Sequence, residues 1–393
     1  MTTEAPVRRG VIAAGWNDLT TRPASQEPAL DALRSFAVLA VICSHFALPE
    51  WPRAGGAALS LARFPLFYYG WTGVDLFFVL SGLLIGRQLW REIQRTGTVS
   101  VGHFLLRRGF RIWPLYFVAL AYLSIVSTTT WADWTFLSNY VQTSFSRGWS
   151  LSTEEQFYIV VPLLLLVSTR LFSLRYQAWP LLALLAAIPI GRIVTQARLI
   201  SLGYSGEPLE FRLNYPIHLH CEPLLIGLLL ALLSTVKPAW FTKVRDGRVA
   251  WRAVGVLLVL GAAGIALDRL DKRIFAFLAL GLIFGGATYL ALVDRSLLTR
   301  PLHAKLFYPI SRLSYGMYLN HFLVVPKSTE WVIRHGAGLP TVAVFFIGLL
   351  VGTLISIAVA TLTFLLVEHP FLQLRSALLE PRIPLVAAAK ETA

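Results

Sequence analysis

Charged residues are scarce in this chain. Asp, Glu, Lys and Arg make up only 14% of its 393 residues, whereas a soluble domain carries about 25%. Hydrophobic residues make up 56% of the sequence, and the apolar stretch over 342–367 is longer than one soluble core requires. Runs of about 20 apolar residues are typical of helices that cross a bilayer. The composition therefore excludes an ordinary soluble protein and favours a membrane protein.

Cysteine is nearly absent as well. The two cysteines, Cys43 and Cys221, both lie in apolar surroundings, so the sequence offers neither a disulfide framework nor a cysteine-based metal site. It also lacks internal repeats and low-complexity segments. Residues 1–26 are largely polar, and no cleavage site of the usual form follows the first long apolar run. We therefore expect an uncleaved N-terminal tail over 1–26.

Acidic residues are outnumbered, with 21 Asp and Glu against 35 Lys and Arg and a net charge of +14. A basic chain can bind nucleic acid, but these cations lie between hydrophobic segments rather than in one patch. They are better explained as topology signals in cytoplasmic loops. Counted on alternate sides, Lys and Arg place both termini in the cytoplasm and the chain in the inner (cytoplasmic) membrane.

The hydrophobic pattern predicts an all-α, polytopic membrane protein with about ten transmembrane helices and no soluble domain. Its domains are an N-terminal tail (1–26), one membrane domain (27–375) and a C-terminal tail (376–393). The segment 306–325 contains Pro309, Asn320 and His321 and is also compatible with a re-entrant hairpin. The predicted spans are 31–48, 66–86, 111–128, 156–173, 178–197, 218–236, 251–267, 273–292, 306–325 and 341–367.

Two ionisable residues mark the first predicted span. Arg34 and His45 are eleven residues apart, so on a helix they fall on nearly the same face, roughly 16 Å apart along the axis. An arginine at the cytoplasmic end of a span is often only an anchor, and His45 is also compatible with an interface histidine. An ionisable residue within a span is nevertheless a functional candidate.

Several short motifs, in order along the chain, resemble the acyltransferase-3 family of integral membrane O-acyltransferases. They are the Arg34 and His45 pair separated by ten residues, Phe77-Phe78-Val-Leu-Ser81, Arg108-Gly-Phe-Arg111, the acidic Glu154-Glu155 after Trp149, Ser314-Tyr315 to His321, and Glu368-His369-Pro370. Each string is short, and together they cover nearly the whole chain. The resemblance implies transfer of an acyl group, usually acetyl from acetyl-CoA, to a hydroxyl group, most often on a carbohydrate.

The resemblance also implies roles for individual residues. His45 is expected to be the general base, because an alcohol is a poor nucleophile until it loses its proton. Arg34 is expected to guide the donor, and Ser81 to stabilise the oxyanion of the thioester. Glu154 is expected near the outer mouth of a polar channel, where it orients the acceptor or His45. As an alternative, Glu154 merely favours a helix N-terminus.

The donor is expected to bind on the cytoplasmic side. Arg107, Arg108 and Arg111 offer partners for the phosphates of acyl-CoA, although a topology signal explains the same cluster. We expect no permanently bound cofactor and no metal. The partners predicted are acyl-CoA, membrane lipids and a hydroxyl-bearing acceptor, which is a polysaccharide, an oligosaccharide, a lipid-linked sugar or a secondary metabolite.

One segment departs from the family pattern. His218-Leu-His220-Cys-Glu222 stands where the family often has Arg-x-Asp, which leaves the roles of these side chains open. A metal site is disfavoured because residues two apart do not share a helical face, and polar lining of a cavity is the alternative. A polytopic transporter or exporter is the rival function, though matching interrupted spans are missing. A non-catalytic membrane partner is a third possibility.

Overall fold

The computed structural model describes residues 10–24, 26–47, 63–143, 148–242, 274–294, 300–336 and 338–379, with eight isolated positions between 252 and 266. These residues form helices joined by turns and contain no β-strand, so the predicted all-α class is confirmed. The main helices are α1 (Val11–Thr20), α2 (Pro28–Ala47), α5 (Pro65–Tyr68), α6 (Gly73–Thr96), α7 (Val101–Val126), α8 (Trp131–Trp134), α9 (Trp149–Leu171), α10 (Ala178–Ser201), α11 (Gly206–Asn214), α12 (Glu222–Val236), α14 (Ala276–Val293), α15 (Phe307–His335), α16 (Thr341–Thr363) and α17 (His369–Leu379).

Seven helical segments within the described ranges are long and apolar enough to cross a membrane. They are Pro28–Phe46, Gly70–Thr96, Val101–Val126, Trp149–Leu171, Leu174–Ser201, Ala276–Val293 and Thr341–Leu379. The last one joins α16 and α17 through a π-helical turn, Phe364–Glu368. The apolar helix α12 is shorter, and α15 is one continuous helix of 29 residues rather than a hairpin. The predicted span 251–267 lies largely outside the described residues.

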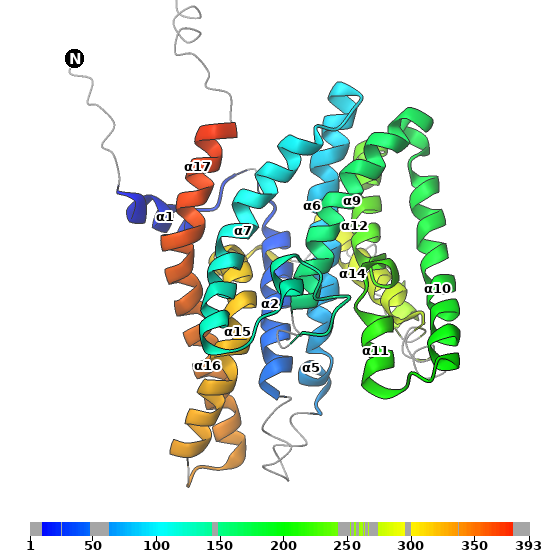
Figure 1. Cartoon of the computed structure of the whole chain (residues 1–393). Helices are drawn as coiled ribbons and strands as arrows, with labels where there is room; N and C mark the ends of the chain where they lie inside the picture. Colours follow the sequence, from blue (N-terminus) through cyan, green and yellow to red (C-terminus); the bar gives the residue numbers. More distant parts are fainter. Residues whose placement is uncertain are drawn as a thin grey trace, which may run out of the picture.

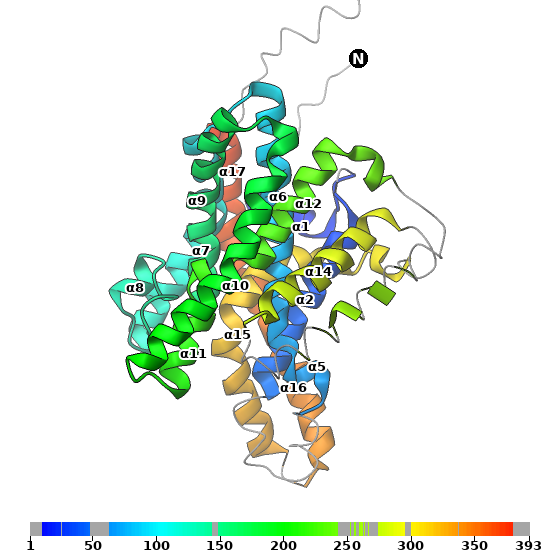
Figure 2. The same cartoon turned by 90° about the vertical axis from the view of Figure 1, so that its right-hand side faces the viewer.

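Several helices begin or end well beyond their predicted limits. Helix α6 continues ten residues past position 86, α7 begins at Val101 and α9 at Trp149. Hydropathy marks only the part of a helix that contacts lipid, whereas backbone hydrogen bonds extend it through polar residues. The expected N-terminal tail likewise contains the helix α1, whose Gly15 and Leu19 are buried. Helices α1 and α17 lie at the same end of the bundle (Figures 1 and 2).

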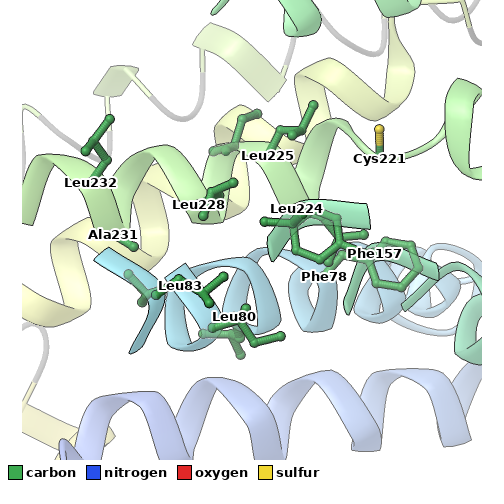
Figure 3. Packing of buried hydrophobic residues seen from close by; sticks show 14 of the residues in the cluster. Phe78, Leu80, Leu83, Phe157, Cys221, Leu224, Leu225, Leu228, Ala231 and Leu232 are labelled. Carbon is green, nitrogen blue, oxygen red and sulfur yellow. The ribbon is translucent and has the colours of Figure 1, made fainter. Parts of the chain in front are cut away.

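The two helices α6 and α12 pack with almost no space between their backbones. A Cβ atom added to Gly82 would overlap the carbonyl oxygen of Leu224, and one added to Gly227 would overlap that of Val79. Small residues allow such close approach between membrane helices. Leucine side chains from both helices, with Phe78 of α6 and Phe157 of α9, surround the contact (Figure 3). This packing fixes α6, which carries Ser81.

Polar contacts and glycines hold α2 among its neighbours. The Ser35 hydroxyl donates to the carbonyl of Phe307 at 2.9 Å, and Ser311 donates to Asp31 at 3.1 Å. Gly73, at the start of α6, lies against the backbone of Ala37 on α2. Helices α2 and α6 therefore run antiparallel, with His45 at the outer end of α2, where outer means the side predicted to face away from the cytoplasm.

Two buried polar contacts fix the segment 218–222, which departs from the family pattern. His220 bonds Asp75 of α6 at 2.9 Å, and Glu222 bonds Arg192 of α10 at 2.8 Å. Arg192 also donates to the carbonyl groups of Leu219 and Ile274. His220 and Glu222 thus join three elements to one another. They do not line the two cavities described below.

Candidate functional site

A wide cavity with a strongly basic wall opens among α2, α6, α7 and α15. We call it the basic cavity; its volume is about 800 Å³. Eight arginines face it against three carboxylates. The arginines are Arg34, Arg87, Arg91, Arg95, Arg107, Arg108, Arg111 and Arg312, and the carboxylates are Glu27, Asp31 and Glu92. Its chemistry therefore suits a ligand with several negative charges.

Helix α6 supplies three of these arginines, which sequence reasoning did not select. Arg87, Arg91 and Arg95 follow one another at intervals of four residues, so they project from one face of the helix. They lie beyond the predicted end of the second span at position 86. The i, i+4, i+8 spacing is the signal that would have revealed this basic face.

The three arginines proposed for the donor all line this cavity, as does Arg34. Arg108 donates to Gln88 of α6 at 3.0 Å, and Arg312 pairs with Asp18 of α1. Asp31, in the first turn of α2, is held by Arg22 at 2.9 Å and by Gln26 at 2.6 Å. One of the three carboxylates in the wall is therefore engaged with other side chains.

A second, much smaller cavity continues from the first toward the outer side. This narrow cavity has a volume of about 90 Å³. It shares Arg34, Leu84, Arg108 and Arg111 with the basic cavity, so the two form one passage. Its remaining wall combines aromatic and hydroxyl side chains. They include Phe77, Phe78, Ser81, Ser150, Glu154, Tyr158, Ser314, Tyr315 and Tyr318.

Glu154 lies deeper in the protein than predicted. One carboxylate oxygen accepts hydrogen bonds from the hydroxyl groups of Ser81 and Tyr158. Ser81 is eight residues inward from Gly73, which places this group about 12 Å from the outer end of α6. Glu154 interacts there with the charge of Arg34. Glu154 therefore lines the narrow cavity below the end of α6, and its predicted role toward the acceptor or His45 stays a prediction.

The proton of Ser81 is committed to Glu154 in this arrangement. Ser81 can stabilise an oxyanion only after it leaves the carboxylate. Ser81 and Arg34 also share the narrow cavity, whereas His45 lies roughly 16 Å beyond Arg34 along α2. The predicted general base and the predicted oxyanion donor therefore do not face the same point.

His45 forms a pair with a second histidine, His321 of α15. His45 Nδ1 lies 3.2 Å from His321 Nε2, and the ring centroids are 4.8 Å apart. The carbonyl of Tyr318 lies 2.6 Å from His321 Nδ1, and the ring of Tyr318 lines the narrow cavity, with its hydroxyl bonded to Ser150. His45 itself does not line the narrow cavity. His321 lies between His45 and Tyr318, which does line it.

Sequence reasoning quoted His321 as part of a late motif but gave it no role. Its proximity to His45 could not be read from positions 276 residues apart. Metal-capable side chains do not gather around the pair: the described part of the chain holds no group of three or more His, Cys, Asp or Glu side chains suited to a metal ion. Two imidazole rings at this distance can exchange a proton.

Comparison with known families identifies the family of the chain. Residues 27–361 match the acyltransferase-3 family, which is described as an acyltransferase domain. The chain belongs to the acyltransferase-3 family. As expected of such a protein, it carries several membrane-crossing helices, and the resemblance inferred from the sequence motifs is confirmed.

Three relatives of this acyltransferase-3 protein carry names that state an activity. A protein of Staphylococcus aureus named "putative O-acetyltransferase" is 27% identical over 392 residues, covering 88% of this chain and 57% of its own length. The "peptidoglycan O-acetyltransferase" of Listeria monocytogenes is 26% identical over 339 residues, covering 77% and 50%. The "putative peptidoglycan O-acetyltransferase" of Bacillus subtilis is 30% identical over 241 residues, covering 53% and 34%. The chain thus spans about half the length of these relatives. No solved structure matches it.

Proposed function

We propose that this protein is an O-acyltransferase of the inner membrane that moves an acyl group, acetyl in the first instance, from acyl-CoA to a hydroxyl group of a carbohydrate. His45 acts as the general base, and both termini face the cytoplasm. One observation carries the proposal: an arginine-lined cavity narrows into a thin polar passage that leads toward a histidine pair. A charged donor head and a slender reactive arm fit this shape.

The basic cavity suits the nucleotide end of acyl-CoA. A volume of about 800 Å³ lies within the usual range for small-molecule sites. Guanidinium groups bind phosphate oxygens through paired hydrogen bonds, and Arg107, Arg108 and Arg111 provide them together with the α6 arginines. The narrow cavity, of about 90 Å³, excludes a nucleotide, and its walls must move apart for a pantetheine arm to enter.

Side chains in the narrow cavity then hold the arm. Pantetheine carries amide N–H groups, and the Glu154 carboxylate is an acceptor already aligned by Ser81 and Tyr158. Arg34 lines both cavities where they meet and guides the part of the donor that follows its phosphates. Glu154 and Ser81 therefore position the donor, and the thioester reaches past them toward Tyr318.

The reaction takes place at the outer end of the passage. His45 removes the proton of the acceptor hydroxyl, and the oxygen attacks the thioester carbonyl. A C–O bond forms and the C–S bond breaks, with the proton passing from His45 to the departing sulfur. The hydroxyl groups of Tyr318 and Ser150 bond each other, and the ring of Tyr318 lies beside that of His321. We assign the contact with the oxyanion to one hydroxyl group of this pair.

The names of two relatives guide the choice of acceptor. Both are named for peptidoglycan O-acetylation, and peptidoglycan is a hydroxyl-bearing carbohydrate polymer on the outer side of the inner membrane. A donor bound on the cytoplasmic side and an acceptor met on the outer side agree with the order of the two cavities. The acceptor we propose is a surface glycan or its lipid-linked precursor.

Binding of the donor tests the central step. We would measure the affinity of the purified full chain in nanodiscs for acetyl-CoA by calorimetry, comparing Arg108→Gln, Arg111→Gln and the control Arg175→Gln. Each cavity variant should weaken binding by about 10-fold or more, since a hydrogen bond to a charged group contributes about 1.5–3 kcal/mol. Arg111→Lys should also weaken it, because an ammonium group cannot form the paired bond. Arg175 lies outside both cavities and its variant should bind normally. Unchanged affinity in both cavity variants would refute the donor site.

A further inference from the structure

We propose that His321 is a positioning residue that fixes the tautomer of His45 and shares the proton which His45 removes. The proposal rests on the proposed function for its chemistry, but its geometric basis is independent. His321 lies on α15, is 2% exposed, and touches His45 of α2 at a hydrogen-bonding distance. Neither the family motif nor the sequence spacing assigns this contact.

The backbone carbonyl of Tyr318, which can only accept a hydrogen bond, contacts the ring of His321. The carbonyl oxygen of Tyr318 lies 2.6 Å from His321 Nδ1. A carbonyl has no proton to donate, so His321 Nδ1 must carry the hydrogen. In the neutral imidazole the other nitrogen is then unprotonated. His321 Nε2, which points at His45, is therefore an acceptor.

The same logic fixes the second ring. His45 Nδ1 lies 3.2 Å from His321 Nε2 and 3.0 Å from the carbonyl oxygen of Val41. Both neighbours accept, so His45 Nδ1 carries a hydrogen that they share. The unprotonated nitrogen of His45 is then Nε2. A general base needs its lone pair on the nitrogen that meets the substrate, and the chain of acceptors places it there.

The pair also distributes charge during the reaction. When His45 Nε2 takes the hydroxyl proton, the ring becomes positive beside His321 Nε2. The hydrogen on His45 Nδ1 can then move to His321 Nε2, so that one N–H bond breaks and one forms. As His45 Nε2 later gives its proton to the departing thiolate, His321 returns the other to His45 Nδ1. Each ring ends with the hydrogen it had at the start.

The environment makes this sharing useful. A positive charge confined to one imidazole ring is costly where water is scarce, and a hydrogen bond to His321 spreads that charge over two rings. Tyr318 and Phe322 flank its ring at centroid distances of 5.5 Å and 5.9 Å. A second imidazole that accepts a hydrogen bond stabilises the charged form of the first. His321 should therefore raise the proton affinity of His45 as well as orient it.

Nitrogen-15 NMR of histidine-labelled protein in nanodiscs tests the tautomers directly, with assignments from His45→Gln and His321→Gln. Both rings should be protonated at Nδ1 when neutral, which is the rarer tautomer in water. In His321→Phe the Nδ1 preference of His45 should weaken, because the carbonyl of Val41 is then the one remaining acceptor printed for Nδ1. If His45 in the unmodified chain is protonated at Nε2 instead, the proposal is overturned, whatever the activity.

Kinetics supply a second readout, with acetyl-CoA as donor and chitotetraose as probe acceptor. His321→Phe should lower kcat on the order of 100-fold with little change in KM, and the acidic limb of its pH profile should move to lower pH. His321→Gln, which restores an acceptor but cannot take a proton, should lie between. His335→Gln, a variant of an exposed histidine on the same helix, should match the unmodified chain. If His45→Gln is inactive but His321→Phe is fully active, the role of His321 is refuted and the proposed function stands. If His45→Gln is active, the proposed function itself is refuted.

Discussion

The buried pair of Arg192 and Glu222 allows a quantitative test of a residue whose role the sequence left open. The two side chains are 1% and 0% exposed and 2.8 Å apart. Removing one partner of a buried pair leaves an uncompensated charge and costs about 3–5 kcal/mol. We therefore expect Glu222→Leu and Arg192→Met each to lose about this much stability. The double variant should lose less than the sum, because neither charge then remains buried alone.

Arg192 complicates the double variant in a calculable way. Its guanidinium also donates to two backbone carbonyls, and each carbonyl left without a donor costs about 1–3 kcal/mol. The double variant should thus lose about 2–6 kcal/mol, which is no more than the sum of about 6–10 kcal/mol expected for the two single variants. The exposed pair Glu330 and Arg334 is the control, and its loss should change stability by less than about 1 kcal/mol.

Unfolding by SDS in mixed micelles, followed through the fluorescence of the tryptophans, measures these values. Acyl transfer per folded molecule is measured in parallel. We expect Glu222→Leu to lower the free energy of unfolding while the folded fraction keeps its activity. A Glu222→Leu protein that is as stable as the original but inactive would show that this carboxylate serves the substrate rather than the fold.

Three further outcomes are expected. Gly82→Ala should destabilise the protein by about 1–3 kcal/mol in the same unfolding assay, because overpacking forces the helices apart, whereas Gly102→Ala, whose added Cβ meets open space, should be tolerated. Ser81→Ala should raise KM for acetyl-CoA rather than lower kcat, since Ser81 bonds Glu154; a fall in kcat of about 100-fold or more would restore Ser81 as an oxyanion donor. Burial lowers the pKa of His218, so the folded state binds fewer protons there than the unfolded state does. The free energy of unfolding should therefore fall as the pH drops below about 6.5. In His218→Phe this pH dependence should be weaker.

The helical membrane architecture was predictable because apolar length is a local property. Each long apolar segment within the described residues forms a helix, and the errors concern the ends, as at Val101 and Trp149. Polar residues there face a cavity rather than lipid, and hydropathy cannot register that difference. Helix α1 was missed because its ten residues are too few to appear as a span.

The candidate site was predictable only in part. Arg34, Arg108 and Ser81 could be selected from motifs, and the structure brings them into one passage. The pairing of His45 with His321 depends on the contact between α2 and α15, which sequence spacing does not encode. His220 and Glu222, in the segment that departs from the family pattern, pair with residues on α6 and α10. Sequence spacing does not encode these contacts either.

The narrow part of the passage has a consequence for the membrane itself. A protein that receives one substrate from each side of an energised bilayer must not become a path for ions. Three guanidinium groups, those of Arg34, Arg108 and Arg111, stand where the two cavities meet. Fixed positive charge at a constriction repels protons and metal cations. We expect the arginines that attract the donor to keep the resting protein impermeable to cations, so their loss should raise proton leak in sealed vesicles.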